Sequence, residues 1–288
     1  MTGVSLIANL SKPNAQAILL EGVEWLQRRG VSVAVSLDLV PHAPKGTPAF
    51  PENELSQHGE MLLAMGGDGT MLRAARIVGR SGKPVLGINL GSLGFLTEIS
   101  LEDLYPTLER VLAGDYRLEH RMVLEAVVER SGQTFYALND AVIRAPSRIV
   151  EMEVTLDGQY VSNYMADGLI VSTPTGSTAY SLACGGPILH PTMETLVVTP
   201  ICPHTLAIRP MIVSASQTVE ATVHCKMEEP LITADGQVSQ NILSGDRIAF
   251  RKASHTIPLV RTTGKTFYEI LRAKLKWAGQ EERPPAAS

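Results

Sequence analysis

The sequence predicts an α/β plus all-β protein, with a Rossmann-like α/β domain at the N-terminus and an antiparallel β domain at the C-terminus. Up to about residue 117, short apolar runs alternate with apolar residues at helical spacing, which is typical of βαβ units and a mainly parallel sheet. Beyond that residue the hydrophobic period changes to two, which is typical of antiparallel strands with one buried face.

The N-terminal elements alternate in type along the chain. Short apolar runs predict buried strands at 4–8, 31–35, 61–65 and 84–88. Amphipathic patterns between and after these runs predict helices at 15–29, 71–78 and 101–112. A Pro-rich stretch, 41–51, is predicted to be a surface loop and a candidate insertion.

The second half of the chain is predicted to consist of short strands. Along 117–129, alternate side chains form an apolar face that comprises Leu118, Met122, Leu124, Ala126 and Val128. The other face is charged and comprises Arg117, Glu119, Arg121, Glu125 and Glu129. The alternation returns at 150–156, which ends in an Asp157-Gly158 turn, and again at 219–225. This pattern leaves both a sandwich and a barrel open.

These patterns set the expected domain boundaries. We expect an α/β domain at 1–117, joined by a C-terminal helix at 266–278. The β-rich domain is expected at 118–265, and the residues 279–288 read as a flexible tail.

Composition favours small-molecule chemistry. The 288 residues are 44% hydrophobic and 19% charged, and the formal net charge of −4 offers no basic surface for nucleic acid or an anionic membrane. The sequence has neither the basic start of a signal peptide nor an apolar run of about 18 residues, which predicts a cytoplasmic protein. The scattered cysteines Cys184, Cys202 and Cys225 are predicted to be reduced core thiols rather than a disulfide framework or a metal site.

A glycine-rich turn, Gly66-Gly67-Asp68-Gly69-Thr70, lies between the predicted strand 61–65 and a predicted helix. Glycines in this position leave backbone N–H groups free to approach phosphate oxygens at a helix N-terminus. The turn therefore predicts a phosphate site formed by Gly66, Gly67, Gly69 and Thr70. It matches neither the P-loop nor the dinucleotide-binding fingerprint.

Asp68 places a negatively charged carboxylate inside this predicted phosphate site. A carboxylate in an anion site repels the ligand unless it binds a metal or takes a proton from a reacting hydroxyl. The alternative is a strand-to-helix turn in which Asp68 is a capping acid, and Thr70 is a plausible N-cap in either case.

Two further segments carry polar side chains behind predicted strands. In Leu138-Asn139-Asp140, an amide and a carboxylate could bridge two ribose hydroxyls, although an Asx turn is the alternative. The segment 167–181 is rich in Ser and Thr and is closed by Gly185-Gly186-Pro187. Such small hydroxyl side chains suit a polyhydroxylated ligand, and the alternative is a Ser/Thr-rich loop with a helix cap.

In this order, the three segments resemble the NAD kinase family, whose superfamily includes diacylglycerol and sphingosine kinases and, more distantly, phosphofructokinases. Segments 89–96 and 203–206, Arg209-Pro210 and Asp235-Gly236-Gln237 extend the resemblance over roughly residues 60 to 250. The resemblance implies transfer of a phosphoryl group from ATP, another triphosphate or polyphosphate to the 2′-hydroxyl of the adenosine ribose of NAD. A lipid kinase and a catalytically silent NAD-binding protein are the alternatives.

The resemblance also implies roles for individual residues. It makes Asp68 the catalytic general base and implies NAD contacts from Asp68, Gly69, Arg73, Asn139, Asp140, Arg148, Asp167, Thr178, Ala179, Tyr180, Ser181, Leu182, Ala183 and Gln237. Some relatives carry a basic residue just before Asp167, where this chain has Met165 and Ala166. A divalent metal, Mg²⁺, is expected to arrive with the nucleotide and without dedicated protein ligands. A homodimer or homotetramer is expected, with no nucleic acid or membrane partner.

Overall fold

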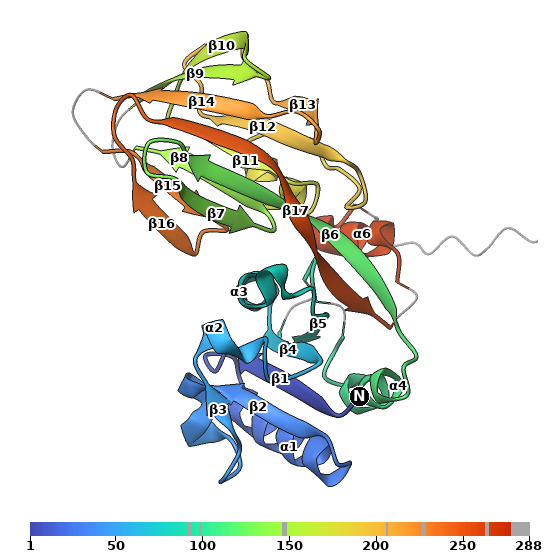
Figure 1. The fold of residues 1–288 in the computed structure, drawn as a ribbon. Helices are drawn as coiled ribbons and strands as arrows, with labels where there is room; N and C mark the ends of the chain where they lie inside the picture. The colour runs from blue at the N-terminus through green and yellow to red at the C-terminus, as the bar shows by residue number, and fades with distance from the viewer. Residues whose placement is uncertain are drawn as a thin grey trace, which may run out of the picture. The chain divides into compact units, whose positions relative to one another are not determined.

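The computed structural model describes residues 1–91, 94–97, 99–145, 149–205, 207–225, 229–262 and 265–277. The chain divides into two compact units, which we call the α/β unit and the β unit (Figure 1). The α/β unit comprises 1–71, 86–117 and the chain from residue 260, and the β unit comprises 72–85 and 118–259. The predicted fold class is confirmed.

The α/β unit is built on a sheet with the strand order β5-β4-β1-β2-β3. Its strands are β1 Gly3–Ala8, β2 Ser32–Ser36, β3 Ala49–Phe50, β4 Met61–Gly66 and β5 Val85–Asn89. Strand β1 runs parallel to both β2 and β4. Every residue of β1, β4 and β5 is buried, which explains why these strands appear in the sequence as unbroken apolar runs.

Helices alternate with the strands of the N-terminal part of the chain, and one more helix lies near the C-terminal end. They are α1 Ala15–Arg28, α2 Glu52–Leu55, α3 Asp68–Val78, α4 Leu104–Leu112 and α6 Phe267–Leu275, with 3₁₀ turns η1 Leu37–His42 and η2 Gly79–Ser81. Leu19 and Leu26 of α1 pack in one hydrophobic cluster with Leu6 and Leu63 of the sheet. Helix α6 begins with a capping box between Thr266 and Glu269.

The predicted surface loop at 41–51 contains more regular structure than expected. Its first residues belong to η1, and Ala49 and Phe50 form the short strand β3, which pairs with Val35 and Ser36 of β2. An edge strand of two residues is too short to produce a hydrophobic period, so the sequence pattern could not reveal it.

The β unit consists of antiparallel strands in two sheets. They are β6 Arg117–Val128, β7 Gln133–Ala137, β8 Asp140–Arg144, β9 Val150–Leu156, β10 Gln159–Ala166, β11 Gly168–Ser172, β12 Thr195–Ile201, β13 Met211–Ser214, β14 Val219–His224, β15 Leu231–Ala234, β16 Val238–Asn241 and β17 Arg247–Arg261. One sheet has the order β10-β9-β14-β17, with β6 paired to β17 and to β7. The other has the order β13-β12-β11-β8-β15-β16, and the short helices η3 Gly176–Thr178 and α5 Tyr180–Ala183 follow β11.

Both sheets of the β unit share one hydrophobic core. Leu124, Val154 and Phe250 from the first sheet belong to the same buried cluster as Ile143 and Val171 from the second. The β unit is therefore a sandwich, which resolves the alternative that the sequence left open.

The charged face predicted for 117–129 is only partly solvent-exposed. Arg121 and Glu125 are 5% and 7% exposed, whereas Leu118, expected on the apolar face, is 42% exposed. The buried charges have partners: Arg121 pairs with Glu119, and Glu125 accepts hydrogen bonds from Tyr136 and Arg251. Burial of a paired charge costs far less than burial of an isolated one. The prediction from polarity alone, which placed Arg121 and Glu125 on the solvent-facing side of the strand, is therefore wrong.

The prediction of core thiols is wrong, although the cysteines are free. Cys202 is exposed, and Cys184 and Cys225 are half-buried. Cys202 directly follows β12 and has a positive φ of 46°, so it lies in a turn and not in a strand.

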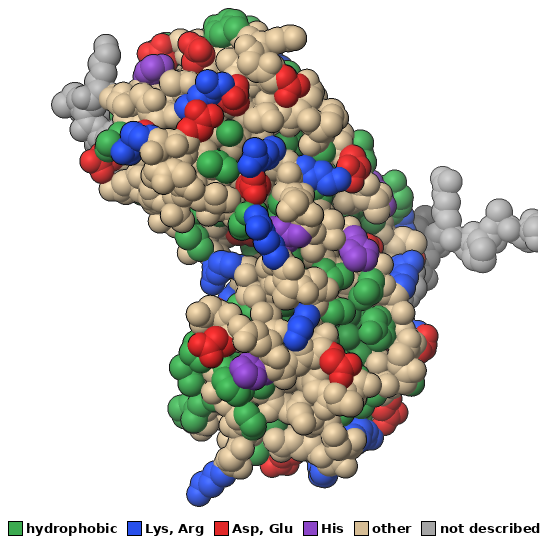
Figure 2. All heavy atoms as spheres, in the orientation of Figure 1, with side chains coloured by type: hydrophobic (Ala, Val, Ile, Leu, Met, Phe, Trp, Pro, Cys, Tyr) green, Lys and Arg blue, Asp and Glu red, His purple; other side chains and the backbone are tan. Residues whose placement is uncertain are grey.

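Within the ranges that the structure describes, no helix combines the length and the apolar character needed to cross a membrane. On the face shown in Figure 2, basic and acidic side chains are interspersed over both units.

Candidate active site

The glycine-rich turn joins β4 to α3 in the α/β unit. Strand β4 ends at Gly66, and α3 begins at Asp68. A Cβ on Gly66 would lie 2.7 Å from Cβ of the buried Thr70, so only glycine fits there. No described atom lies within 4 Å of where a Cβ on Gly67 or Gly69 would be. The space beside these two glycines is open to an approaching phosphate.

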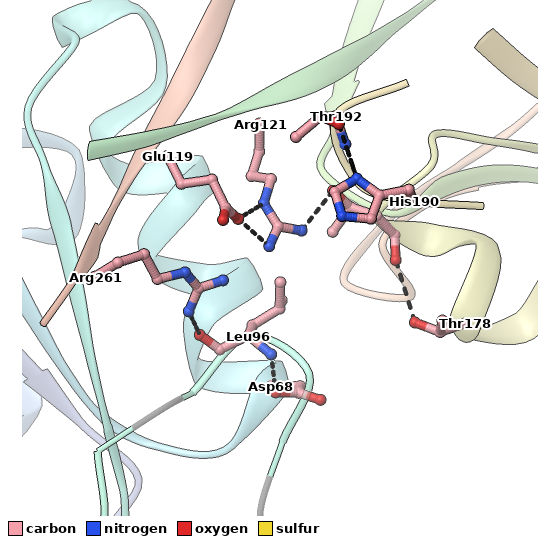
Figure 3. A network of polar contacts seen from close by, with 9 residues as sticks. Asp68, Leu96, Glu119, Arg121, Thr178, His190, Thr192 and Arg261 are labelled. Atoms are coloured by element: carbon pink, nitrogen blue, oxygen red, sulfur yellow. Dashed lines mark hydrogen bonds and ion pairs between the residues drawn. The ribbon is translucent and has the colours of Figure 1, made fainter. Parts of the chain in front are cut away.

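The carboxylate of Asp68 is held by the loop that follows β5. Its Oδ2 accepts a hydrogen bond from the backbone N–H of Phe95 at 2.9 Å, and its Oδ1 accepts one from Leu96 at 3.0 Å. Arg261 in turn donates to the carbonyl of Leu96 at 3.4 Å, and Figure 3 shows the contacts from Arg261 through Leu96 to Asp68. A Cβ on Gly94 would lie 2.9 Å from Cγ of Asp68, so this loop can approach the carboxylate only with glycine there.

These contacts bear on the alternative role of Asp68 as a helix cap. Its described hydrogen bonds run to residues 95 and 96, far along the chain, and not to the first turn of its own helix. The side chain is half-buried and has a fixed orientation. A fixed carboxylate beside an open glycine turn is suited to orienting a reacting group.

The second predicted segment lies in the β unit, where Asp235 fixes its backbone. Oδ2 of Asp235 accepts from the N–H of Leu138 at 2.8 Å, while Oδ1 accepts from Asn139 at 2.8 Å and from Asp140 at 3.2 Å. Asp235 follows β15 and has a positive φ of 51°. Asp140 begins β8 and is only 5% exposed.

Two carboxyl groups therefore lie close together in a poorly hydrated place. Burial, with the nearby charge of Asp235, raises the pKa of Asp140 to about 7. Burial also raises the pKa of Asp235, while the three backbone N–H groups and the charge of Arg76 oppose that shift. Asp140 thus changes its protonation state near neutral pH.

The third predicted segment packs directly on the second. The N–H of Thr173 donates to the carbonyl of Asn139 at 2.8 Å, and its hydroxyl donates to the carbonyl of Leu138 at 2.6 Å. A Cβ on Gly176 would lie 2.6 Å from Cα of Asn139, so the glycine permits this approach. The second and third predicted segments, although separate in sequence, are therefore packed against each other.

Most hydroxyl groups of the third segment have hydrogen-bond partners within the protein. The side chains of Ser177 and Ser181 are fully buried. Ser177 donates to the carbonyl of Pro174, and Ser181 shares a hydrogen bond with Thr199 at 2.9 Å. Thr175 accepts from Arg121 at 3.2 Å, and the hydroxyl of Thr178 donates to the carbonyl of Thr175. The run of Ser and Thr that suggested a polar ligand therefore also has a structural explanation.

A cavity of about 540 Å³ opens beside these segments within the β unit. It is lined by Asn139, Asp140, Val142, Arg144, Ala179, Tyr180, Leu231, Thr233, Asp235 and Gly236. The volume falls in the range of small-molecule sites. The lining combines polar groups with the aliphatic Val142 of β8 and Leu231 of β15, which suits a ligand with both hydroxyls and a flat apolar ring.

Four of the predicted ligand residues line this cavity, namely Asn139, Asp140, Ala179 and Tyr180. Sequence reasoning missed Val142, Arg144, Leu231, Thr233, Asp235 and Gly236 as lining residues. The alternation along β8 contained a signal, because Asp140, Val142 and Arg144 are two residues apart and share one face of the strand.

The other predicted residues lie elsewhere in the described structure. Arg73 is half-buried on α3, and Leu182 and Ala183 belong to α5. Asp167 is exposed between β10 and β11, and Gln237 is exposed and accepts a hydrogen bond from Arg76 at 2.7 Å. Arg148 lies outside the described residues.

A phosphate-type glycine turn with a fixed carboxylate, on a parallel-sheet unit that is followed by a β sandwich with a polar cavity, defines a nucleotide-dependent phosphotransferase. Comparison with family models agrees. The ATP-NAD kinase N-terminal domain matches residues 4–116, and the ATP-NAD kinase C-terminal domain matches residues 138–262. The chain belongs to the ATP-NAD kinase family.

Individual relatives support this assignment. The NAD kinase of Geobacter sp. (strain M21) is 45% identical over 96% of this chain and 99% of its own length, and that of Moorella thermoacetica is 45% identical over 100% and 94%. Among solved structures, an NAD kinase from Archaeoglobus fulgidus in complex with ATP has a TM-score of 0.76 at 25% identity and covers 96% of this chain and 100% of its own. Yeast NADH kinase complexed with NADH has a TM-score of 0.88 at 24% identity and covers 98% and 89%, which shows the shared fold.

Proposed function

We propose that this chain is an NAD kinase that transfers the terminal phosphoryl group of ATP to the 2′-hydroxyl of the adenosine ribose of NAD. The observation that carries the proposal is the Asp68 carboxylate, which is held by Phe95 and Leu96 within an open glycine turn. The names of its relatives, which are 42–45% identical over nearly their full length, point to the same reaction.

In this proposal Asp68 orients the 2′-hydroxyl and receives its proton. The transition state of phosphoryl transfer is loose, so the proton leaves late and a carboxylate is basic enough to accept it. The turn formed by Gly66, Gly67, Gly69 and Thr70 binds phosphate oxygens at the start of α3, while the N–H of Thr70 itself donates to the carbonyl of Gly67. Charge stabilisation and positioning supply most of the rate.

The NAD site in this proposal is the cavity of the β unit. Asn139 and Asp140 bind ribose hydroxyls, and Ala179 and Tyr180 contact the ring system. The remaining proposed NAD contacts come from Gly69, Arg73, Arg148, Asp167, Thr178, Ser181, Leu182, Ala183 and Gln237. Arg144 adds a guanidinium on the cavity wall that is suited to the pyrophosphate.

We expect Mg²⁺ to enter as the ATP complex and to balance charge on the phosphates. Both oxygens of Asp68 already accept backbone hydrogen bonds. Among the described side chains, no three of His, Cys, Asp or Glu gather into a metal site. A magnesium titration at fixed ATP should therefore follow the concentration of the Mg²⁺–ATP complex.

The same proposal extends to assembly and compartment. We expect a homodimer or homotetramer, since the β unit carries apolar side chains such as Tyr160 and Ile212 that are 66% and 47% exposed. Light scattering on the purified protein would measure the mass. The cytoplasm, predicted from the sequence, is the expected compartment.

The test of the proposed activity is direct. The purified protein is incubated with NAD, ATP and Mg²⁺, and NADP is measured with an NADP-specific dehydrogenase. We expect steady NADP formation that needs all three components. No NADP above the level of a protein-free control would refute the proposed function. Phosphorylation of diacylglycerol or sphingosine in a parallel reaction would favour the lipid kinase alternative.

A further inference from the structure

Asp235 forms an unusual group of hydrogen bonds at the edge of the cavity. Its two oxygens accept the N–H groups of three consecutive residues, Leu138, Asn139 and Asp140, at 2.8, 2.8 and 3.2 Å. The backbone N–H of Asp235 donates to the carbonyl of Asp140 at 2.9 Å. Asp235 therefore accepts hydrogen bonds from the segment Leu138–Asp140 and also donates one to it.

Burial raises the pKa of Asp235, but its hydrogen bonds and the charge of Arg76 favour the carboxylate form. Hydrogen bonds to a carboxylate from several N–H groups are stronger than hydrogen bonds to a neutral acceptor. Arg76 on α3 lies near enough for its charge to act on Asp235, and it donates to Gln237 two residues further along. The turn Asp235-Gly236-Gln237 is thus fixed on both sides.

We propose that Asp235 is a positioning residue for NAD, whose carboxylate holds the Leu138–Asp140 backbone so that Asn139 and Asp140 present their side chains to the cavity. This inference rests on the proposed function of the cavity. Asp235 itself lines the cavity. Its contribution would come mainly through the segment it holds.

Asparagine cannot replace Asp235 in this role. Its single amide oxygen can accept from at most two of the three N–H groups, and its NH₂ group would face a donor. At least one of these N–H groups would lose its partner, and the segment would shift to satisfy it. Because Asn139 and Asp140 lie in that segment, NAD binding should suffer before the fold of the sandwich does.

The charge of Asp235 supplies a second, independent effect. The titratable groups whose charges couple to Asp140 are Asp235, Tyr180 and Cys184, and the cation Arg144 lines the same cavity. Of these, Asp235 is the negative group that raises the pKa of Asp140. Removing the charge should lower the pH at which Asp140 ionises, which a purely structural role would not do.

The experiment compares Asp235→Asn with the matched control Asp246→Asn. Asp246 is another carboxylate of the β unit, 2% exposed, that accepts from Arg130 and from the N–H of Leu243. We expect Asp235→Asn to raise KM for NAD about tenfold or more, with KM for ATP changed less than about twofold. The pH midpoint of kcat/KM for NAD should fall relative to wild type. Asp246→Asn should lower the melting temperature but leave both KM values and the pH midpoint unchanged.

Several outcomes would overturn the inference while leaving the proposed function intact. An unchanged KM for NAD in Asp235→Asn would do so. An equal rise of KM for NAD in Asp235→Asn and Asp246→Asn would also do so. If Asp235→Asn does not fold, hydrogen exchange on wild-type protein decides instead. Slow exchange of the amides of Leu138, Asn139 and Asp140 supports the inference, and fast exchange of all three contradicts it. Failure of wild-type protein to form NADP would instead refute the proposed function.

Discussion

At the scale of single residues, Asp68 is the proposed general base. Its carboxylate has a fixed direction, because Phe95 and Leu96 each donate a backbone N–H to it. The substitution Asp68→Asn keeps the size of the side chain and one acceptor oxygen. We predict a loss of about 10²- to 10⁴-fold in kcat, as is typical when a general base is removed, with similar affinity for NAD. A variant that retains more than about a tenth of the wild-type rate would show that Asp68 has only a structural role.

Asp140 is a proposed NAD contact whose raised pKa implies a cost in stability. Its pKa rises from the ordinary value of 3.8 to about 7 on folding, so between these values the folded chain holds a proton that the unfolded chain releases. Stability therefore falls as the pH rises from about 4 to about 7. The amide side chain that Asp140→Asn introduces does not titrate. We therefore predict that at pH 8 the free energy of unfolding of this variant exceeds that of wild type by about 1 to 4 kcal/mol, so that it unfolds at a higher urea concentration.

The same substitution should weaken NAD binding. An amide lacks the negative charge and second acceptor oxygen that ribose hydroxyls would use, a loss of about 1 to 3 kcal/mol. Urea unfolding at pH 5 and pH 8, with calorimetric titration of NAD, measures both effects. A variant less stable than wild type at pH 8 would contradict the raised pKa. Unchanged NAD affinity would remove Asp140 from the NAD site.

At the scale of elements, the loop after β5 sets the position of Asp68. A Cβ on Gly94 would lie 2.9 Å from Cγ of Asp68 and 2.5 Å from Oγ1 of Thr97, so Gly94→Ala must push the carboxylate or the loop aside. Since displacement of a catalytic group by about 1 Å can cost about 10²-fold, we predict a fall in kcat of at least about tenfold.

The matched control lies in the same loop. Among the described atoms, a Cβ on Gly91 would meet only Nζ of Lys12, at 3.9 Å, so Gly91→Ala should leave kcat near wild type. Steady-state kinetics of both variants, with their melting temperatures, separate displacement from unfolding. Wild-type kcat in Gly94→Ala would mean that the contact with Asp68 is unimportant.

Hydrophobic periods predicted the strands well where the buried side chains are mainly apolar. The fully buried β1 and β4 and the alternating β9 and β14 all appear near their predicted ranges. The method failed where polar groups are buried with partners. Arg121 and Glu125 on β6 looked solvent-facing because a sequence does not show which charge pairs with which.

The candidate site was predictable in part for the same reason. Asn139, Asp140, Ala179 and Tyr180 stood out as motif residues and line the cavity. Ser177 and Ser181 belong to the same motif, and their hydroxyl groups hydrogen-bond within the protein, which the sequence could not show. Asp235 was missed because its role depends on three N–H groups almost a hundred residues away.

At the scale of the whole molecule, the division into two units follows the contacts between residues and not chain continuity. Helix α3 is continuous from Asp68 to Val78, yet its first residues group with the α/β unit and the residues from Leu72 group with the β unit. A sequence pattern cannot show such a boundary, since the helical period is uninterrupted. The residue-by-residue domain limits remain predictions.

The most direct test of the central claim measures phosphoryl transfer to NAD, to NAD that lacks the 2′-hydroxyl on its adenosine ribose, and to NADP, under identical conditions with Mg²⁺ and ATP. We predict rapid transfer to NAD and no transfer to the other two, because each lacks a free 2′-hydroxyl for Asp68 to orient. NADP should instead compete with NAD. Transfer to the 2′-deoxy compound at a rate near that for NAD would place the accepting hydroxyl elsewhere and contradict the role of Asp68.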